Sequence, residues 1–332
     1  MPRHLRYQST PSAQHLITAR CIQGYDLLQP SPTRNLLIAG CLARALEHSA
    51  GEVELHHYVV MSNHLHLIIT SVTSHAKARF MCHLSSNLAR EICRSRPWSE
   101  HVWGSRYHSH ELLDEEALIS AYKYLFKNCV KEGLVEHPRE WPGLHGWAQL
   151  CEGRTVVGEW VERARCFWAR QTKRGARLTE RDFTRTLPLT LTRPARWAHM
   201  GEEEYVGRCR AWAEEAVREG REEAVARWTA ELRARGLTRA EASLALFAVL
   251  GAEAVCAQDV FRRRPARRAP RPLCRSGCPA RFVGYMSEYR RFRERFLEAS
   301  RLLRAAVARG APAPRVTFPA GGVPFFVGTL NT

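Results

Sequence analysis

The sequence lacks any apolar run long enough to cross a membrane. A membrane-spanning helix needs about 20 mostly apolar residues, and no stretch approaches that length. Residues 1–14 contain arginine and histidine but no apolar centre of the kind found in secretion signals. These absences predict a protein that is not exported, does not bind membranes and is located in the cytoplasm.

Regularly spaced cysteines are also missing. The 11 cysteines are scattered through 332 residues, whereas disulfide scaffolds are short secreted chains with closely recurring cysteines. We therefore expect reduced thiols. Cys274 and Cys278 lie close together, but no second Cys or His pair at zinc-finger spacing follows them, so a zinc knuckle is not indicated.

The chain has an excess of basic charge. It holds 50 Lys and Arg against 33 Asp and Glu, a formal net charge of +17. Residues 1–150 hold 15 basic and 13 acidic side chains, and residues 151–332 hold 35 and 20. This excess favours a polyanionic partner. Nucleic acid is favoured over a membrane because no segment has a large segregated apolar face. The length and this charge shift predict two domains, divided near residue 150.

The first domain has the pattern of an α+β fold. Strands are predicted at residues 14–21, 53–60, 64–71 and 106–113, and helices at 33–48, 75–96 and 115–132. The order is β-α-β-β-α-β with one added helix, which is the ferredoxin-like pattern. Such a sheet covers one face with its two helices and leaves the other face available for a site.

Two histidines, His64 and His66, stand at the start of the third predicted strand. Alternate residues of a strand point to one face, so both imidazoles share a face while Leu65, Leu67 and Ile69 pack on the other. Neutral imidazole is the commonest nitrogen ligand of metals, and the pair could form half of a metal site. On spacing alone, half-buried histidines bonded to backbone or water are the more frequent explanation.

The added helix carries Tyr124 and Asn128, which are four residues apart and share one face. A tyrosine hydroxyl has a pKa of about 10 and is a poor nucleophile without a nearby cation or base. A divalent metal would polarise a scissile phosphate, and the Asn128 amide oxygen could complete a two-histidine site beside Tyr124. The alternative is an aromatic surface of Tyr122, Tyr124 and Phe126, on a helix ended by Gly133.

Several ordered motifs resemble those of the REP-associated tyrosine transposases, the bacterial branch of the single-tyrosine HUH, or IS200-like, transposases. They are Tyr58-Val-Val-Met-Ser-Asn-His-Leu-His-Leu, Trp103-Gly-Ser-Arg-Tyr, and Tyr124-Leu-Phe-Lys-Asn-Cys-Val-Lys-Glu-Gly-Leu-Val followed by Glu140-Trp-Pro-Gly. The resemblance extends from about residue 6 to residue 147. Cys129 departs from it, because the family usually has a proline there, and this change bears on helix geometry.

The resemblance implies that His64, His66 and Asn128 hold a divalent metal, magnesium or manganese, and that Tyr124 is the nucleophile. It implies cleavage and rejoining of single-stranded DNA at hairpins of palindromic repeats, through a 5′-phosphotyrosine, by a monomer or homodimer near the bacterial nucleoid. Two other classes stay open: a non-catalytic nucleic-acid-binding protein that keeps the fold, and a hydrolytic metalloenzyme that uses the histidine pair.

Candidate DNA-binding residues fall into two groups. Arg106 and Tyr107 lie near Trp103, and unpaired bases stack on aromatic side chains, although such aromatics are more often core residues. The second group lies in residues 261–281, the basic segment, which holds arginines and prolines and no acidic residue. Its candidates are Arg262, Arg263, Arg264, Arg267 and Arg268. A solvated loop would have the same composition.

The remainder of residues 151–332 is predicted to be mainly helical. Amphipathic helices are expected at residues 201–220, 222–235, 238–250 and 283–309. The turn at Gly236 between the second and third helices could indicate a helix-turn-helix that reads DNA. Ordinary helix packing gives the same pattern.

Overall fold

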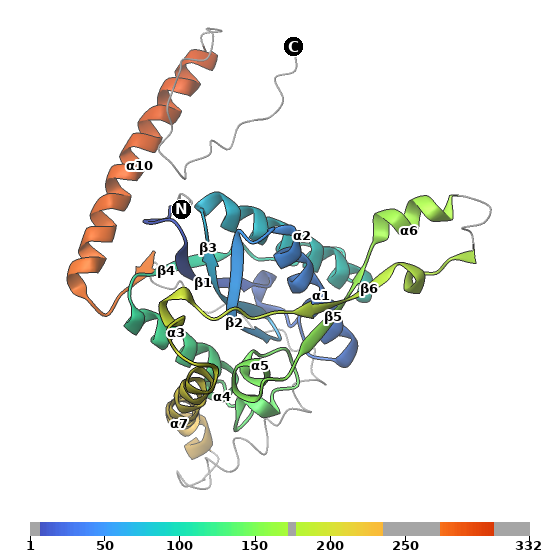
Figure 1. The fold of residues 1–332 in the computed structure, drawn as a ribbon, viewed down its shortest axis with the longest axis horizontal. Coiled ribbons are helices and arrows are strands. Elements are labelled where there is room, and N and C mark those ends of the chain that lie inside the picture. Colours follow the sequence, from blue (N-terminus) through green and yellow to red (C-terminus); the bar gives the residue numbers. More distant parts are fainter. Residues whose placement is uncertain (1–6, 172–176, 235–272, 309–332) are drawn as a thin grey trace.

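A five-stranded sheet forms the centre of the computed structural model, which describes residues 7–171, 177–234 and 273–308. The strand order is β2-β3-β1-β4-β7, with helices on both faces (Figure 1). The elements of the predicted domain are β1 (Ala13–Arg20), α1 (Pro32–His48), β2 (Val53–Met61), β3 (His64–Ser71), α2 (Ser74–Ser95) and β4 (His108–Leu112). Their pairings are antiparallel. This is the ferredoxin-like arrangement, and the predicted α+β class is confirmed.

Local capping explains where the helices begin and end. Ser31 precedes Pro32 and accepts a hydrogen bond from the Arg34 N–H at 3.2 Å, so α1 begins at the proline. Asp114 accepts a bond from the Ala117 N–H at 2.9 Å and starts α3 (Glu115–Phe126). The chain continues into α4 (Asn128–Lys131). Gly133 follows with φ +72°, the left-handed conformation that ends a helix.

Each face of the sheet packs in its own hydrophobic core. The first core contains α1 and α2, and the second core contains α3. Side chains of β3 alternate between them, so Leu65, Leu67 and Ile69 pack with α1 and α2. Ile68 points the other way, into the core that contains α3. His64 and His66 share this second face. The sheet face that was predicted to be available for a site is therefore partly covered by α3, the helix that carries Tyr124.

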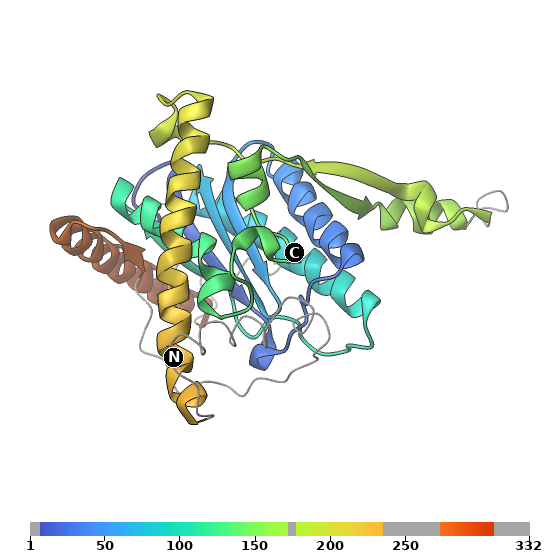
Figure 2. The same ribbon diagram turned by 90° about the horizontal axis from the view of Figure 1, so that it is seen from below.

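The second core continues into the C-terminal half of the chain. Trp197 is fully buried and Trp212 nearly so, and both pack with residues of α3. Trp212 belongs to α7 (Glu202–Ala234), which packs along α3, α4 and α5 (Trp147–Glu152) (Figure 2). The packing is thus continuous across residue 150.

One long helix replaces two that the sequence predicted. Residues 201–220 and 222–235 were expected to form separate helices, but α7 runs through Gly220 without a break. A Cβ at Gly220 would lie 3.1 Å from Lys127 Cβ and 3.3 Å from Val130 Cβ. The glycine therefore allows α7 to approach α4 closely and does not end a helix.

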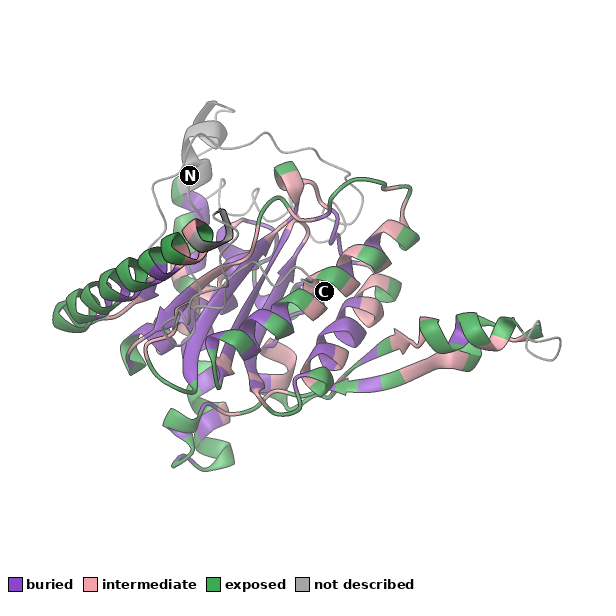
Figure 3. Cartoon of the chain, turned by 90° about the horizontal axis from the view of Figure 1, so that it is seen from above, coloured by how far each residue is buried: buried purple, intermediate pink, exposed green. Residues whose placement is uncertain are grey.

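A projecting hairpin was not predicted. It consists of β5 (Val156–Val161), α6 (Arg163–Arg170) and β6 (Thr184–Leu189), with β5 and β6 antiparallel. Its distal part is mostly exposed, whereas the central strands are buried (Figure 3). Near its base, Leu187 and Leu189 belong to the core that α1 and α2 form on the sheet.

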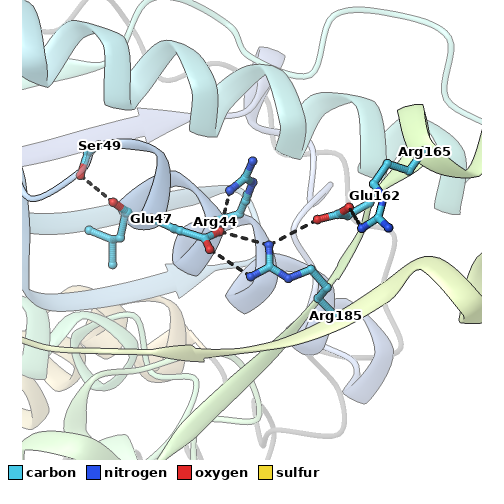
Figure 4. Close-up of polar contacts among 7 residues, drawn as sticks. Arg44, Glu47, Ser49, Glu162, Arg165 and Arg185 are labelled. Carbon is cyan, nitrogen blue, oxygen red and sulfur yellow. Dashed lines mark hydrogen bonds and ion pairs between the residues drawn. The ribbon is translucent and has the colours of Figure 1, made fainter.

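Ion pairs join this hairpin to α1. Arg185 of β6 lies 3.0 Å from Glu47 of α1 and 3.3 Å from Glu162, and Glu47 also pairs with Arg44 at 2.6 Å (Figure 4). Hydrogen bonds from Arg185 and Arg44 hold the pKa of Glu47 below its usual value. Exposed pairs of this kind contribute little to stability, so the hairpin depends mainly on its packing.

We expect Gly158→Ala to destabilise the protein by about 1–3 kcal/mol. A Cβ at Gly158 would overlap the backbone of Ala39 and Gly40, because β5 crosses α1 at closely approaching glycines. Urea denaturation would measure the effect. The matched control is Gly207→Ala in α7, where a Cβ meets nothing within 4 Å and alanine should stabilise by about 0.5–1 kcal/mol. Equal stability of the two variants would contradict the packing of β5 on α1.

The last described segment adds the fifth strand and a long helix. β7 (Cys274–Arg275) pairs in parallel with β4, and α10 (Pro279–Ala308) follows it. Tyr285, Tyr289 and Phe292 of α10 pack with Cys274 in a small third core. This helix starts four residues before the predicted one. The helix predicted at 238–250 and the turn at Gly236 lie outside the described residues.

Shorter elements complete the structure. Within the described residues, 3-10 helices occur at Ile22–Gly24, Pro138–Glu140, Glu180–Phe183 and Ala195–Trp197. Within the described ranges, no helix combines the length and apolar character that a membrane span requires. The cysteines of the same ranges are all free thiols.

Candidate active site

The two predicted histidines lie side by side on the sheet face that α3 covers. Both are buried, and the centroids of the His64 and His66 rings are 4.9 Å apart with planes at 83°. They come from alternate positions at the start of β3, so the strand itself sets their spacing. The predicted common face is confirmed.

Hydrogen bonds fix how each imidazole is held. His64 Nδ1 lies 2.6 Å from Asn63 Oδ1, and an amide oxygen can only accept, so this nitrogen carries the hydrogen. His66 Nδ1 lies 2.8 Å from Thr18 Oγ1. Thr18 is paired with His66 across β1 and β3. Partners at Nδ1 orient an imidazole so that Nε2 is presented to a ligand.

Tyr124 approaches the same histidine from the other side. Its hydroxyl oxygen lies 3.3 Å from His66 Nε2, and the two ring centroids are 5.1 Å apart. Helix α3 crosses β3 here, which brings together residues 58 positions apart in sequence. The predicted proximity of the tyrosine to the histidine pair is thus present in the structure.

The neighbouring tyrosine is in a different environment. Tyr122 is fully buried, and its hydroxyl donates to the His56 carbonyl oxygen at 3.3 Å and contacts the Tyr205 hydroxyl at 3.1 Å. Burial raises the pKa of Tyr122 well above its usual value. It is therefore a core residue, and the alternative of an aromatic surface does not hold for it.

Asn128 follows Tyr124 by one helical turn and is fully buried. Neither its Oδ1 nor its Nδ2 atom has a hydrogen-bond partner among the described residues. A buried amide without a partner costs about 1–3 kcal/mol. Lys127, between α3 and α4, keeps helical angles of φ −81° and ψ −2°, so Cys129 in place of the family proline accompanies a nearly continuous helix.

Two cations border the tyrosine ring. Lys131 Nζ lies 3.9 Å from the centroid of the Tyr124 ring, and the Arg275 guanidinium carbon lies 5.7 Å from it. Lys131 is the last residue of α4, whereas Arg275 comes from β7. Thr18, Lys131 and Arg275 were not predicted from the sequence to lie next to the site.

The structure describes only some of the predicted DNA-binding residues. Arg106 and Tyr107 immediately precede β4 and are half-buried, with Tyr107 packed against the first core. Trp103 also packs there, and its indole N–H donates to the Ser85 carbonyl oxygen at 2.8 Å. Residues 262–268, which include the predicted arginines of the basic segment, lie outside the described residues.

No group of three or more His, Cys, Asp or Glu side chains in the described ranges is arranged to hold a metal ion. The candidate metal ligands are instead the imidazoles of His64 and His66 and the side-chain amide of Asn128. Nitrogen and oxygen donors of this type accept divalent first-row metals. The buried Asn128 amide, which has no hydrogen-bond partner among the described residues, has an oxygen of the kind that could serve as a further ligand.

A comparison with protein families identifies the region that contains these residues. Residues 43–127 match the family model described as "Transposase IS200 like". This segment is similar to the IS200-like transposases. The matched segment includes His64, His66 and Tyr124, and Asn128 is the first residue after it. This assignment indicates a transposase-type function.

One solved structure is also similar to the chain. It is a REP-associated tyrosine transposase bound to a REP hairpin, with 18% sequence identity and a TM-score of 0.39. The match covers 46% of this chain and 87% of that chain. No curated protein sequence matches the chain.

Proposed function

We propose that the protein is a single-strand DNA endonuclease and strand transferase that forms a 5′-phosphotyrosine at Tyr124. The observation that carries the proposal is the contact of 3.3 Å between the Tyr124 hydroxyl and His66 Nε2, within an IS200-like domain. A tyrosine at this position can reach a phosphate that is bound beside the histidine pair.

The proposed step exchanges one phosphate ester for another. The Tyr124 hydroxyl oxygen bonds to phosphorus and its proton leaves to solvent. The bond from phosphorus to the 3′ oxygen breaks, and that oxygen takes the bonding pair and one proton to become a free 3′-hydroxyl. Rejoining is the reverse step, and it needs no external energy because the covalent link conserves the phosphate ester.

The side chains that would hold a divalent metal, magnesium or manganese, are His64, His66 and Asn128. Oriented Nε2 atoms and an otherwise unpartnered buried amide fit this role. When bound, the metal polarises the scissile phosphate. Thr18 and Asn63 hold the two rings in place, and Lys131 packs on the ring of Tyr124.

The proposed partner is single-stranded DNA with hairpins of palindromic repeats. A formal charge of +17 favours binding to phosphates. We assign the reacting groups to residues 1–150 and additional DNA contacts to residues 151–332. Arg106 and Tyr107 are proposed to contact DNA near the sheet, and the arginines of the basic segment to contact its backbone.

Incubation with a labelled hairpin oligonucleotide tests the proposal. A labelled band that stays with the protein through denaturing electrophoresis is the expected result. Cleavage with release of both products would indicate a hydrolytic metalloenzyme, and binding without cleavage would indicate a non-catalytic binding protein. Either of these results would contradict the proposed function.

The basic segment should determine much of the salt dependence of DNA binding. We expect a variant with Arg262, Arg263, Arg264, Arg267 and Arg268 changed to Gln to lower the slope of log affinity against log salt. Each phosphate contact contributes roughly 0.7–0.9 to that slope, so five contacts contribute about 3.5–4.5 units. Fluorescence anisotropy at several salt concentrations measures it.

The matched control for this test removes five exposed arginines from α10. These are Arg290, Arg291, Arg293, Arg295 and Arg301. If both variants flatten the slope equally, the basic segment acts only through net charge. An unchanged slope would identify it as a solvated linker, and a shifted cleavage position would mean that it reads the DNA sequence.

A further inference from the structure

The strand β7 reaches the site from a distant part of the chain. Cys274 and Arg275 pair with Glu111 and Leu112 of β4. The Glu111 N–H donates to the Leu273 carbonyl oxygen, and the Leu113 N–H donates to the Arg275 carbonyl oxygen, each at 3.1 Å. Cys274 and Arg275 lie far beyond the segment 43–127 that matches the IS200-like family, whereas their partners in β4 lie within it.

A single carboxylate holds this strand next to the helix of the tyrosine. Asp114 caps α3 through the Ala117 N–H, at 2.9 Å. The same side chain accepts bonds from the Ser276 hydroxyl and from the Gly277 N–H, the latter at 3.3 Å. The start of α3 and the end of β7 are therefore fixed to one group. The position of Arg275 relative to Tyr124 follows from this arrangement.

Buried packing supports the strand from the other side. Cys274 is 1% exposed and lies in the third core with Tyr285 and Tyr289 of α10. The side chain of Arg275, next in sequence, is half-buried and extends to the ring of Tyr124, at 5.7 Å from the ring centroid. The anchored strand thus places a cation beside the proposed nucleophile.

We infer that Arg275 is a phosphate-binding residue of the active site, supplied by the C-terminal part of the chain, and that Lys131 is its partner. The inference rests on the proposed function. A phosphate under attack by Tyr124 must lie next to its hydroxyl, within reach of both long cationic side chains. Arginine offers planar paired donors that match two phosphate oxygens, and lysine adds a point charge.

The role of Arg275 is to hold the non-bridging oxygens of the scissile phosphate as charge develops in the transition state. Lys131 lies against the ring of Tyr124 and limits its movement, as a cation–π contact does. Strand β7 thus adds the fifth strand to the sheet and also supplies Arg275 to the proposed phosphate site.

Full-length protein with Arg275→Gln tests the inference. We expect the single-turnover rate of adduct formation at saturating hairpin DNA to fall about 100-fold. Arg275→Lys keeps the charge without the paired donors and should recover part of that rate. Arg290→Gln is the matched control, because it removes the same charge from an exposed position on α10, and its saturating rate should equal that of the wild type.

Three results would overturn the inference. In the first, Arg275→Gln reacts as fast as Arg290→Gln at saturating DNA. In the second, only the DNA concentration for half-maximal rate changes, which would make Arg275 a general binding residue. In the third, both Arg275 variants lose the same rate and the same thermal stability, which would make the residue structural. Failure of the proposed function is distinguishable, because the wild-type protein would then form no adduct.

Discussion

Tyr124→Phe should abolish the covalent protein–DNA adduct while leaving the fold and hairpin binding nearly intact. The change removes only the hydroxyl that lies 3.3 Å from His66 Nε2. The ring keeps its contacts with His66 and Lys131. Loss of one such hydrogen bond costs about 1 kcal/mol, too little to unfold the protein. Denaturing electrophoresis with a labelled hairpin oligonucleotide measures the adduct, and gel-shift titration measures binding.

Tyr122→Phe is the matched control for this prediction. It makes the same chemical change two residues away, and the variant should still form the adduct. Its stability should fall by about 1–3 kcal/mol, because its partners, the Tyr205 hydroxyl and the His56 carbonyl oxygen, are buried. This stability cost is separate from adduct formation, because the Tyr122 hydroxyl lies in the second core. Adduct formation by Tyr124→Phe, or its loss in Tyr122→Phe alone, would contradict the assignment of the nucleophile.

Removal of either His64 or His66 should strongly lower the affinity of the protein for manganese. We expect His64→Ala and His66→Ala each to weaken manganese binding more than Thr18→Val does, because the threonine only orients His66. Changes to such orienting residues lower metal affinity about 10–100-fold. Isothermal titration calorimetry with manganese, without DNA, measures all three variants. His108→Ala is the control, since β1 separates this histidine from His66 on the sheet.

Asn128→Ala should behave differently from the histidine variants. Water can replace an amide oxygen, so the loss of manganese affinity should be smaller. In metal-free protein the change removes a buried amide that has no partner among the described residues. It should therefore leave thermal stability unchanged or raise it by about 1 kcal/mol. Unchanged manganese affinity in both histidine variants would make His64 and His66 ordinary strand residues held by Asn63 and Thr18.

The sequence predicted the domain that positions the site because that domain consists of regular elements. The alternation of Leu65, Leu67 and Ile69 with His64 and His66 fixed which face of β3 each side chain occupies. Gly133 was predicted as the residue that ends the helix of Tyr124, and its φ of +72° agrees. Within residues 1–150, strand and helix boundaries differ from the prediction by at most two residues, because the ends of elements fray.

Contacts between distant elements could not be predicted in the same way. Thr18 bonds to His66 because of the register between β1 and β3, and no local pattern encodes that register. The crossing of β5 over α1 depends on two glycines, Gly40 and Gly158, that are unremarkable separately. Gly220 appeared to end a helix, and only the approach of α4 shows why α7 continues through it.

The sequence by itself thus determined the ferredoxin-like element order, the common face of the histidine pair, and the spacing of Tyr124 and Asn128 on one helix. Each depends on the period of a strand or helix, which neighbouring residues encode. The tertiary structure alone decided that Arg275 borders Tyr124. A strand of two residues has no periodicity to detect, and its place beside β4 depends on Asp114 and on the packing of α10.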